Sequence, residues 1–240
     1  MSRPAQLAAD WLCRTYNGLV ELASPDVVHE TSAAWLLGCR SVAQPGFPRT
    51  PMLAASVVVP KYGCLPYHPA PHAPLADLEP APNWQYTDRL VSQPRRLNVR
   101  GRVTALHHRV DRITVSPLPW APGHEAPGWW GRLARRYFPR FEETAVGDWD
   151  DVIGAIAGTG PDSRGLVWIR REMSGQEITG HLVYVHNNGG QVVFLDAMTA
   201  SLARLETEGV RELRLLRSPP GAPERPDPGL RSRPGLSGGG

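Results

Sequence analysis

The residue types that could do chemistry concentrate at residues 180–199, which read GHLVYVHNNGGQVVFLDAMT. His181 begins one strand-like run, and Asp196 ends the next one. The intervening NNGG at 187–190 predicts a hairpin, because Asn and Gly accept the positive φ angles of a tight turn. A hairpin brings the two side chains to the same end, where a carboxylate can hold and orient the histidine of a Cys-His-Asp triad. A hairpin of this size can also carry a His and an Asp by chance, so the spacing leaves a purely structural role open.

A nucleophile for such a triad has to come from elsewhere in the chain. The cysteines are Cys13, Cys39 and Cys64, an odd number without a C-x-x-C motif, which argues against a disulfide framework and a zinc site. Cys64 is the best surrogate among them, because it lies in a loop beside Lys61 and a nearby cation favours the thiolate. All three lie far upstream of His181 in the sequence.

Composition and charge exclude several classes of protein. Hydrophobic residues make up 41% of the chain and charged residues 20%, enough for a buried core. The net charge is +3, and acidic residues are interspersed with the arginines, so we expect no nucleic-acid partner. No apolar run reaches the ~18 residues of a membrane span, and the N-terminus shows no signal peptide, so we expect a cytoplasmic protein without membrane contact. P-loop, G-x-G-x-x-G and HExxH motifs are absent, and we expect no cofactor and no metal.

Composition divides the chain into four segments. Residues 1–65 predict a helix followed by a small antiparallel sheet. Residues 66–83 are proline-rich and predict an extended linker in which His68 and His72 are solvated. Residues 84–217 predict a larger domain, and residues 218–240, rich in Pro and Gly, predict a disordered tail.

The larger domain has helical patterns first and strand patterns second, which predicts an α+β fold with an antiparallel sheet. The predicted helices cover residues 98–111, 129–138 and 148–158, and the predicted strands cover 165–171, 181–187, 191–196 and 210–217. Trp129 and Trp130 are adjacent on one predicted helix and cannot both face inward, so we expect one of them at a partner surface.

The hairpin pattern G-H … V-x-F-L-D resembles the His and Asp motifs of the papain-fold toxin domain family, the glutamine-deamidase-like effectors of bacterial polymorphic toxin systems. The family's nucleophile lies upstream in a motif like R-x-N-C-x-x-C-x-x-A, and residues 96–105 (RLNVRGRVTA) match its arginine, asparagine and alanine. Val99 stands at the position of the first cysteine and Arg102 at that of the second. Met198 stands where the family usually has glutamine. The resemblance covers residues 95–205.

The resemblance implies a papain-like α+β fold that has lost its nucleophilic cysteine. A valine cannot attack a carboxamide, so His181 and Asp196 are then a vestigial catalytic pair and the protein is a pseudoenzyme. The alternative is an active cysteine-dependent protein-glutamine deamidase or protease, which uses His181 and Asp196 with one of the remaining thiols.

Residues 5–75 resemble the YrhB-type immunity domain, also called immunity protein 35. The matching patterns are V-x-E-T at 28–31, the aromatic Trp35, and VVVPKYG at 57–63. The two resemblances together imply a non-catalytic, protein-binding component of a toxin–immunity system. Its implied partner is a papain-fold toxin or the target of such a toxin, and the sequence sets no oligomeric state.

Overall fold

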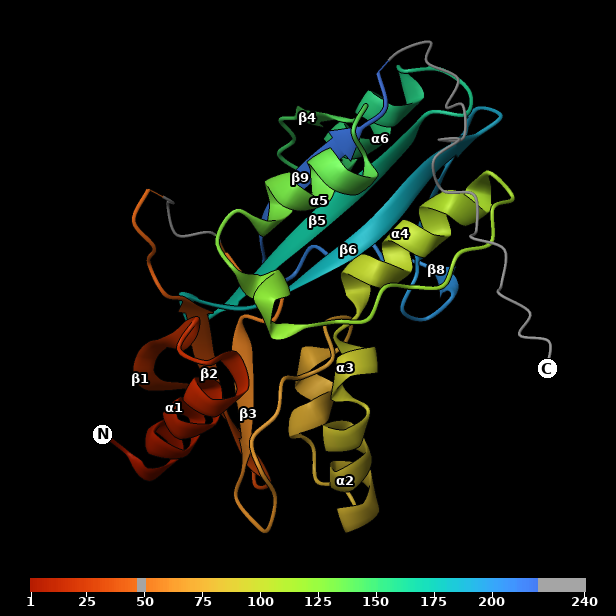
Figure 1. The fold of residues 1–240 in the computed structure, drawn as a ribbon. Coiled ribbons are helices and arrows are strands. Elements are labelled where there is room, and N and C mark those ends of the chain that lie inside the picture. Colours follow the sequence, from red (N-terminus) through yellow and green to blue (C-terminus); the bar gives the residue numbers. More distant parts are fainter. Residues whose placement is uncertain (47–50, 220–240) are drawn as a thin grey trace, which may run out of the picture.

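The structure is a computed structural model, and it describes residues 1–46 and 51–219. Nearly all of the tail predicted to be disordered, residues 220–240, lies outside the described residues. Helices and two antiparallel sheets make up the described part, so the predicted α+β class is confirmed (Figure 1). The helices are α1 (Arg3–Tyr16), α2 (Asn83–Val91), α3 (Gln93–Arg96), α4 (Val99–Val110), α5 (Trp129–Tyr137) and α6 (Trp149–Ala157). Short 3-10 helices are η1 (Pro74–Leu78) and η2 (Pro122–Glu125).

The first sheet has the order β1-β2-β3, and all its pairs are antiparallel. Its strands are β1 (Val20–Glu30), β2 (Ala34–Ser41) and β3 (Ser56–Pro60). Helix α1 covers this sheet because residues at helical spacing, from Ala5 to Tyr16, form a buried apolar face. The helix ends at Asn17, which adopts the left-handed conformation that asparagine tolerates. The predicted helix and small sheet are therefore present.

The second sheet has the order β4-β9-β5-β6-β7-β8 and is also antiparallel. Its strands are β4 (Glu142–Thr144), β5 (Arg164–Met173), β6 (Gln176–Asn188), β7 (Gln191–Asp196), β8 (Ser201–Leu202) and β9 (Val210–Arg217). Side chains alternate between the two faces of a strand. On β6, Leu182 and Tyr184 pack with α4 and α5, whereas Val183 and Val185 pack with α6. Helices thus cover both faces.

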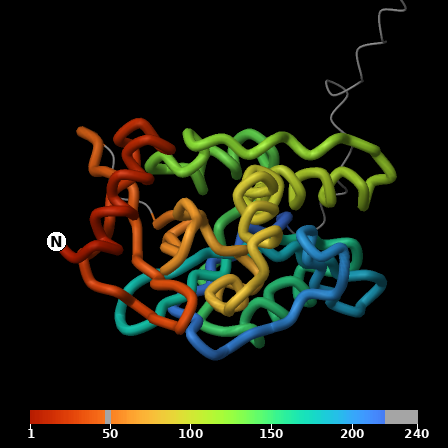
Figure 2. The backbone as a smooth tube through the Cα atoms, turned by 90° about the horizontal axis from the view of Figure 1, so that it is seen from below, coloured from red at the N-terminus to blue at the C-terminus, as the bar shows by residue number. Residues whose placement is uncertain are grey.

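Residues 66–82 pack into the protein and do not form the exposed spacer expected of a proline-rich linker. Tyr67 pairs with Val58 of β3 and is fully buried, and its hydroxyl donates to the carbonyl of Asp77. His68 is buried as well, and His72 is half-buried. Figure 2 shows this segment, in orange, in the middle of the molecule. Strand pairing and the buried Tyr67 side chain hold this proline-rich segment in a compact path. The boundaries of the predicted domains remain a prediction.

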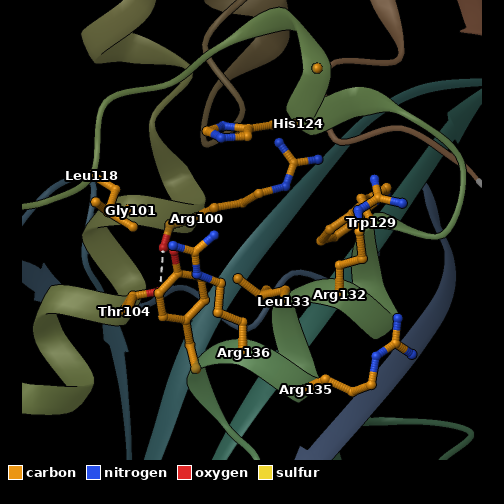
Figure 3. Close-up of a pocket in the computed structure, with 12 residues that line it drawn as sticks. Arg100, Gly101, Thr104, Leu118, His124, Trp129, Arg132, Leu133, Arg135 and Arg136 are labelled. Atoms are coloured by element: carbon orange, nitrogen blue, oxygen red, sulfur yellow. Dashed lines mark hydrogen bonds between the residues drawn. The ribbon is translucent and has the colours of Figure 1, made fainter. Parts of the chain in front are cut away.

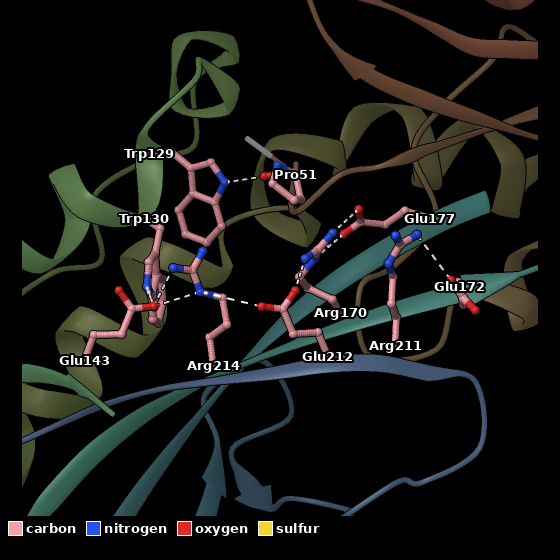
Figure 4. A network of polar contacts seen from close by, with 10 residues as sticks. All are labelled: Pro51, Trp129, Trp130, Glu143, Arg170, Glu172, Glu177, Arg211, Glu212 and Arg214. Carbon is pink, nitrogen blue, oxygen red and sulfur yellow. Dashed lines mark hydrogen bonds and ion pairs between the residues drawn. The ribbon is translucent and has the colours of Figure 1, made fainter. Parts of the chain in front are cut away.

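Trp129 and Trp130 are both buried, so the expectation that one of them faces a partner is wrong. Trp129 packs against Trp168 of the sheet, and its indole N–H donates to the carbonyl of Pro51 at 2.7 Å. Trp130 also packs against Trp168, and its indole N–H donates to Glu143 at 3.3 Å. Trp130 lies beside a network of ion pairs on this face of the sheet (Figure 4). The network consists of Glu143, Arg170, Glu177, Glu212 and Arg214.

Candidate functional site

The hairpin of β6 and β7 brings His181 and Asp196 into direct contact, as the sequence predicts. The Nε2 of His181 lies 3.0 Å from Oδ2 of Asp196, and both side chains are buried. The other carboxylate oxygen accepts the backbone N–H of Met198 at 2.7 Å. Burial alone would raise the pKa of Asp196, but the contact with His181 and the Met198 N–H lower it to about 2. The carboxylate therefore stays ionised and holds Nε2 as the protonated nitrogen of the ring.

The second ring nitrogen of His181, Nδ1, is buried and has no hydrogen-bond partner among the described residues. In a triad this is the nitrogen that faces the nucleophile. His181 borders a cavity of about 340 Å³ that His72, Arg171 and Glu206 also line. Among the described residues lining this cavity there is no cysteine, and its hydroxyls, Thr199 and Ser201, are hydrogen-bonded to each other at 2.8 Å.

The structure does not bring Val99 to His181. Helix α4 begins at Val99, directly after its N-cap Asn98, so this part of the local prediction is confirmed. The valine side chain is fully buried and packs with Leu182 and Tyr184, on the α4 face of the sheet. His181 alternates with Leu182 along β6 and its register partner is Ile169, which packs on the α6 face. The position that resembles the family's nucleophile and the candidate base therefore face opposite sides of the sheet.

Each of the three cysteines lies in the first part of the chain, and none lines the His181 cavity. Cys39 is buried in the core beneath α1, where its thiol donates to the carbonyl of Ala54 at 3.2 Å. Burial raises the pKa of this thiol well above its ordinary value, which opposes thiolate formation. Cys13 is exposed on α1, and Cys64 is partly buried against the core that contains Tyr67.

Comparison with known families bears on the second half of the chain. Residues 97–201 match the family model described as papain fold toxin 1, glutamine deamidase. The matched segment includes Val99, His181 and Asp196, and it covers less than half of the chain. The match does not reach residues 1–65, so the YrhB-type immunity domain remains a prediction.

Among solved structures, the chain shows a distant similarity to the Salmonella effector SpvD, G161 variant. The identity is 12%, the TM-score is 0.35, and the match covers 48% of this chain and 65% of that chain. The match thus spans less than two thirds of the length of that effector. A comparison with curated proteins gives no match.

Arg102, within the matched segment, holds the loop that follows Asp196. Its guanidinium donates to the carbonyl of Met198 at 3.3 Å, so two of the three residues that depart from the pattern of the resembled family contact each other. Arg100, two residues earlier in α4, reaches instead to Glu125 at 2.7 Å. Neither arginine has His181 as a partner.

A larger groove, which the motifs in the sequence do not indicate, runs along α4 beside the Asp196 loop. Its volume is about 1090 Å³, and apolar side chains of the segment 113–119 and of the loop after β7 line it. Arg95, Arg102 and Arg109 also line the groove, spaced seven residues apart from α3 through α4. The seven-residue spacing of these arginines is the sequence signal for the groove, because residues seven apart lie on the same side of a helix.

Across residues 1–46 and 51–219, no group of three or more His, Cys, Asp or Glu side chains is arranged to hold a metal ion. No helix in the same ranges is long and apolar enough to cross a membrane.

Proposed function

We propose that this protein is a non-catalytic, protein-binding component of a bacterial polymorphic toxin–immunity system, in which a papain-fold toxin domain has become a binding scaffold. The observation that carries the proposal is the His181 ring: Asp196 holds one nitrogen, and the other is buried without a nucleophile. A general base acts on a nucleophile that lies within about 3 Å. Val99 has no thiol and packs on the opposite face of the sheet.

The alternative is an active cysteine-dependent protein-glutamine deamidase or protease, and the intact contact between His181 and Asp196 favours it. This enzyme would need Cys13, Cys39 or Cys64 to approach His181. Cys39 would also have to leave a core in which its thiol is protonated and hydrogen-bonded. The binding scaffold requires no such rearrangement.

Thiol reactivity distinguishes the two functions. The native protein and His181→Ala are alkylated briefly at pH about 6, and labelling of each cysteine is measured by peptide mass spectrometry. We expect slow labelling of every cysteine and no change in His181→Ala, because a thiol with a pKa of about 8.5 is almost wholly protonated at this pH. Fast labelling of one cysteine that His181→Ala abolishes would contradict the pseudoenzyme and favour the deamidase or protease.

The groove along α4 is the surface that we assign to the protein partner. Its apolar lining and the three arginines Arg95, Arg102 and Arg109 fit a segment that carries apolar and acidic side chains. Such a segment would belong to a papain-fold toxin or to the target of one, met in the cytoplasm and without nucleic acid. The loop after Asp196 forms one wall of this groove, so the papain-fold site contributes to binding without catalysing a reaction.

Charge reversal tests this assignment. The probe is a purified, active papain-fold toxin of the glutamine deamidase type, titrated into the full chain by calorimetry. Arg109 is exposed, so Arg109→Glu leaves the fold intact, and we expect it to weaken binding by about tenfold or more. The control is Arg112→Glu, an exposed arginine outside the groove, which we expect to change the affinity by less than about twofold. Equal effects of the two variants would remove the groove from the proposal.

A further inference from the structure

A separate cavity of about 400 Å³ lies between α4 and α5, on the face of the sheet opposite His181. Five of the twelve residues that line it carry basic side chains (Figure 3). They are Arg100 from α4, His124 from η2, and Arg132, Arg135 and Arg136 from α5. Among the described residues that line this cavity, none is acidic. Figure 3 shows Arg100 extending below His124, and Arg136 extending from α5 towards α4.

Arg100 is the buried centre of this basic cavity. Its side chain is 9% exposed, and its guanidinium lies over the ring of Trp129 at 4.3 Å. One nitrogen, Nη1, donates to Glu125 at 2.7 Å, but Nε and Nη2 are buried without an acceptor among the described residues. An unsatisfied buried donor destabilises the folded protein, and more strongly when the group is charged. Arg100, which lines the cavity, therefore carries two buried donors for which the described residues supply no acceptor.

Charge in the cavity is not balanced by the protein. Glu125 is buried beneath Arg100, and although burial alone would raise its pKa, the charge of Arg100 holds it below its usual value. Glu125 thus offsets the charge of Arg100, and the positive charges of Arg132, Arg135 and Arg136 have no acidic residue in the described lining. Burial and the charge of Arg100 lower the pKa of both His124 and Arg132, as expected where cations repel one another.

We propose that this cavity binds the oligophosphate group of a small molecule. A guanidinium group can donate two parallel hydrogen bonds to the oxygens of a phosphate. A triphosphate also carries the negative charge needed to balance the positive charge of the arginines. A single carboxylate or phosphate would leave most of that charge uncompensated. Leu118 and Leu133 add an apolar wall beside the arginines, so the organic part of a nucleoside triphosphate has a surface to contact.

Calorimetric titration of the full chain with inorganic tripolyphosphate tests the site. We expect binding to the native protein and a loss of about tenfold or more in Arg136→Gln, because a charge-assisted hydrogen bond is removed. Arg136 is exposed, so this variant keeps its fold. The matched control is Arg140→Gln, an exposed arginine just beyond α5 that does not line the cavity, and its affinity should stay within about twofold.

Titration with ATP forms the second arm of the experiment. Tighter binding of ATP than of tripolyphosphate assigns a nucleotide to the cavity, whereas equal binding assigns the phosphate chain alone. The proposal is overturned if tripolyphosphate binds no more tightly than sulfate, or if Arg136→Gln and Arg140→Gln lose the same affinity. His181→Ala should bind tripolyphosphate as the native protein does, because His181 lies on the other face of the sheet, so this result does not depend on the proposed pseudoenzyme.

Discussion

His68 shows how a single side chain can make the fold sensitive to pH. Its Nδ1 lies 2.6 Å from the carbonyl oxygen of Ser56, which can only accept, so Nδ1 carries the proton. In the neutral ring, Nε2 then accepts the hydroxyl of Tyr16 at 2.5 Å. Burial lowers the pKa of His68 to about 4, from an ordinary value near 6.5.

We therefore expect the free energy of unfolding to fall as the pH drops from about 6.5 to 4. Between these values the unfolded chain binds a proton at His68 that the folded chain does not, so acid favours unfolding. The folded pKa of about 4 corresponds to a loss of about 3 kcal/mol across the window. Urea unfolding at intervals between pH 4.5 and 7.5 measures it. His68→Gln should make the free energy of unfolding depend less on pH. The control His29→Gln, in a partly exposed strand position, should leave the pH dependence unchanged. A native protein whose free energy of unfolding does not change over this pH range would contradict the role given to His68.

At the scale of single residues, the sequence predicted the contact that follows from hairpin register and missed those that follow from tertiary packing. His181 and Asp196 are 15 residues apart across a tight turn, so strand pairing alone brings them together. The basic cavity has no comparable signal, because Arg100 and Arg136 belong to different helices. His68 looked solvated because prolines surround it, and only the packed path of the chain buries it.

At the scale of the elements, α4 lies against the segment 113–119 at a position where only glycine fits. A Cβ built on Gly101 would lie 2.1 Å from the carbonyl oxygen of Leu118, and a backbone atom cannot move aside as a flexible side chain can. This close approach also forms part of the boundary between the basic cavity and the groove, since Gly101 lines the first and Pro117 the second.

Gly101→Ala should lower the free energy of unfolding by about 1–3 kcal/mol, because the added methyl group pushes the segment away from α4. Gly154→Ala is the matched control in α6, where nothing lies within 4 Å of the added Cβ. That substitution should stabilise the protein by about 0.5–1 kcal/mol through helix propensity. Thermal unfolding of both variants gives the comparison, and a neutral Gly101→Ala would show that the segment moves without cost.

Elements with strong local signals were predictable, and those built on tertiary contacts were not. Helix α6 begins where Asp148 accepts the N–H of Asp151 at 2.9 Å, a cap that the sequence indicates directly. Helices α2 and α3 were missed because prolines interrupt a polar stretch without a clear apolar stripe. Strand β6 begins five residues earlier than predicted, since Ser174 and Gly175 form a turn that extends the pairing with β5.

At the scale of the whole molecule, the two sheets are joined by buried polar contacts. Glu125 accepts the backbone N–H of Leu53 at 3.0 Å and pairs with Arg100 at the start of α4. The carbonyl of Leu53 accepts the backbone N–H of Gly180 at 2.8 Å, which continues the connection into β6. A core beneath the first sheet also includes Ile178 from the second.

We therefore expect residues 1–217 to unfold in one cooperative transition. Calorimetry should give a single peak, and near- and far-ultraviolet circular dichroism should report the same midpoint. Glu125→Gln should lower stability by about 3 kcal/mol or more, because it leaves the charge of Arg100 buried without its partner. Glu79→Gln, an exposed carboxylate, serves as the control. Two separate peaks in the native protein would instead favour the predicted division at residues 66–83.

The alternation of side chains along β6 also decides what a restored cysteine could reach. Val99→Cys would restore the first of the two cysteines in the motif that residues 96–105 resemble, yet the new thiol would lie among Leu182 and Tyr184 while His181 points to the other side of the sheet. A thiol at this position would need a shift of strand register or a repositioned helix to meet His181. Geometry as well as one missing atom therefore separates position 99 from the candidate base.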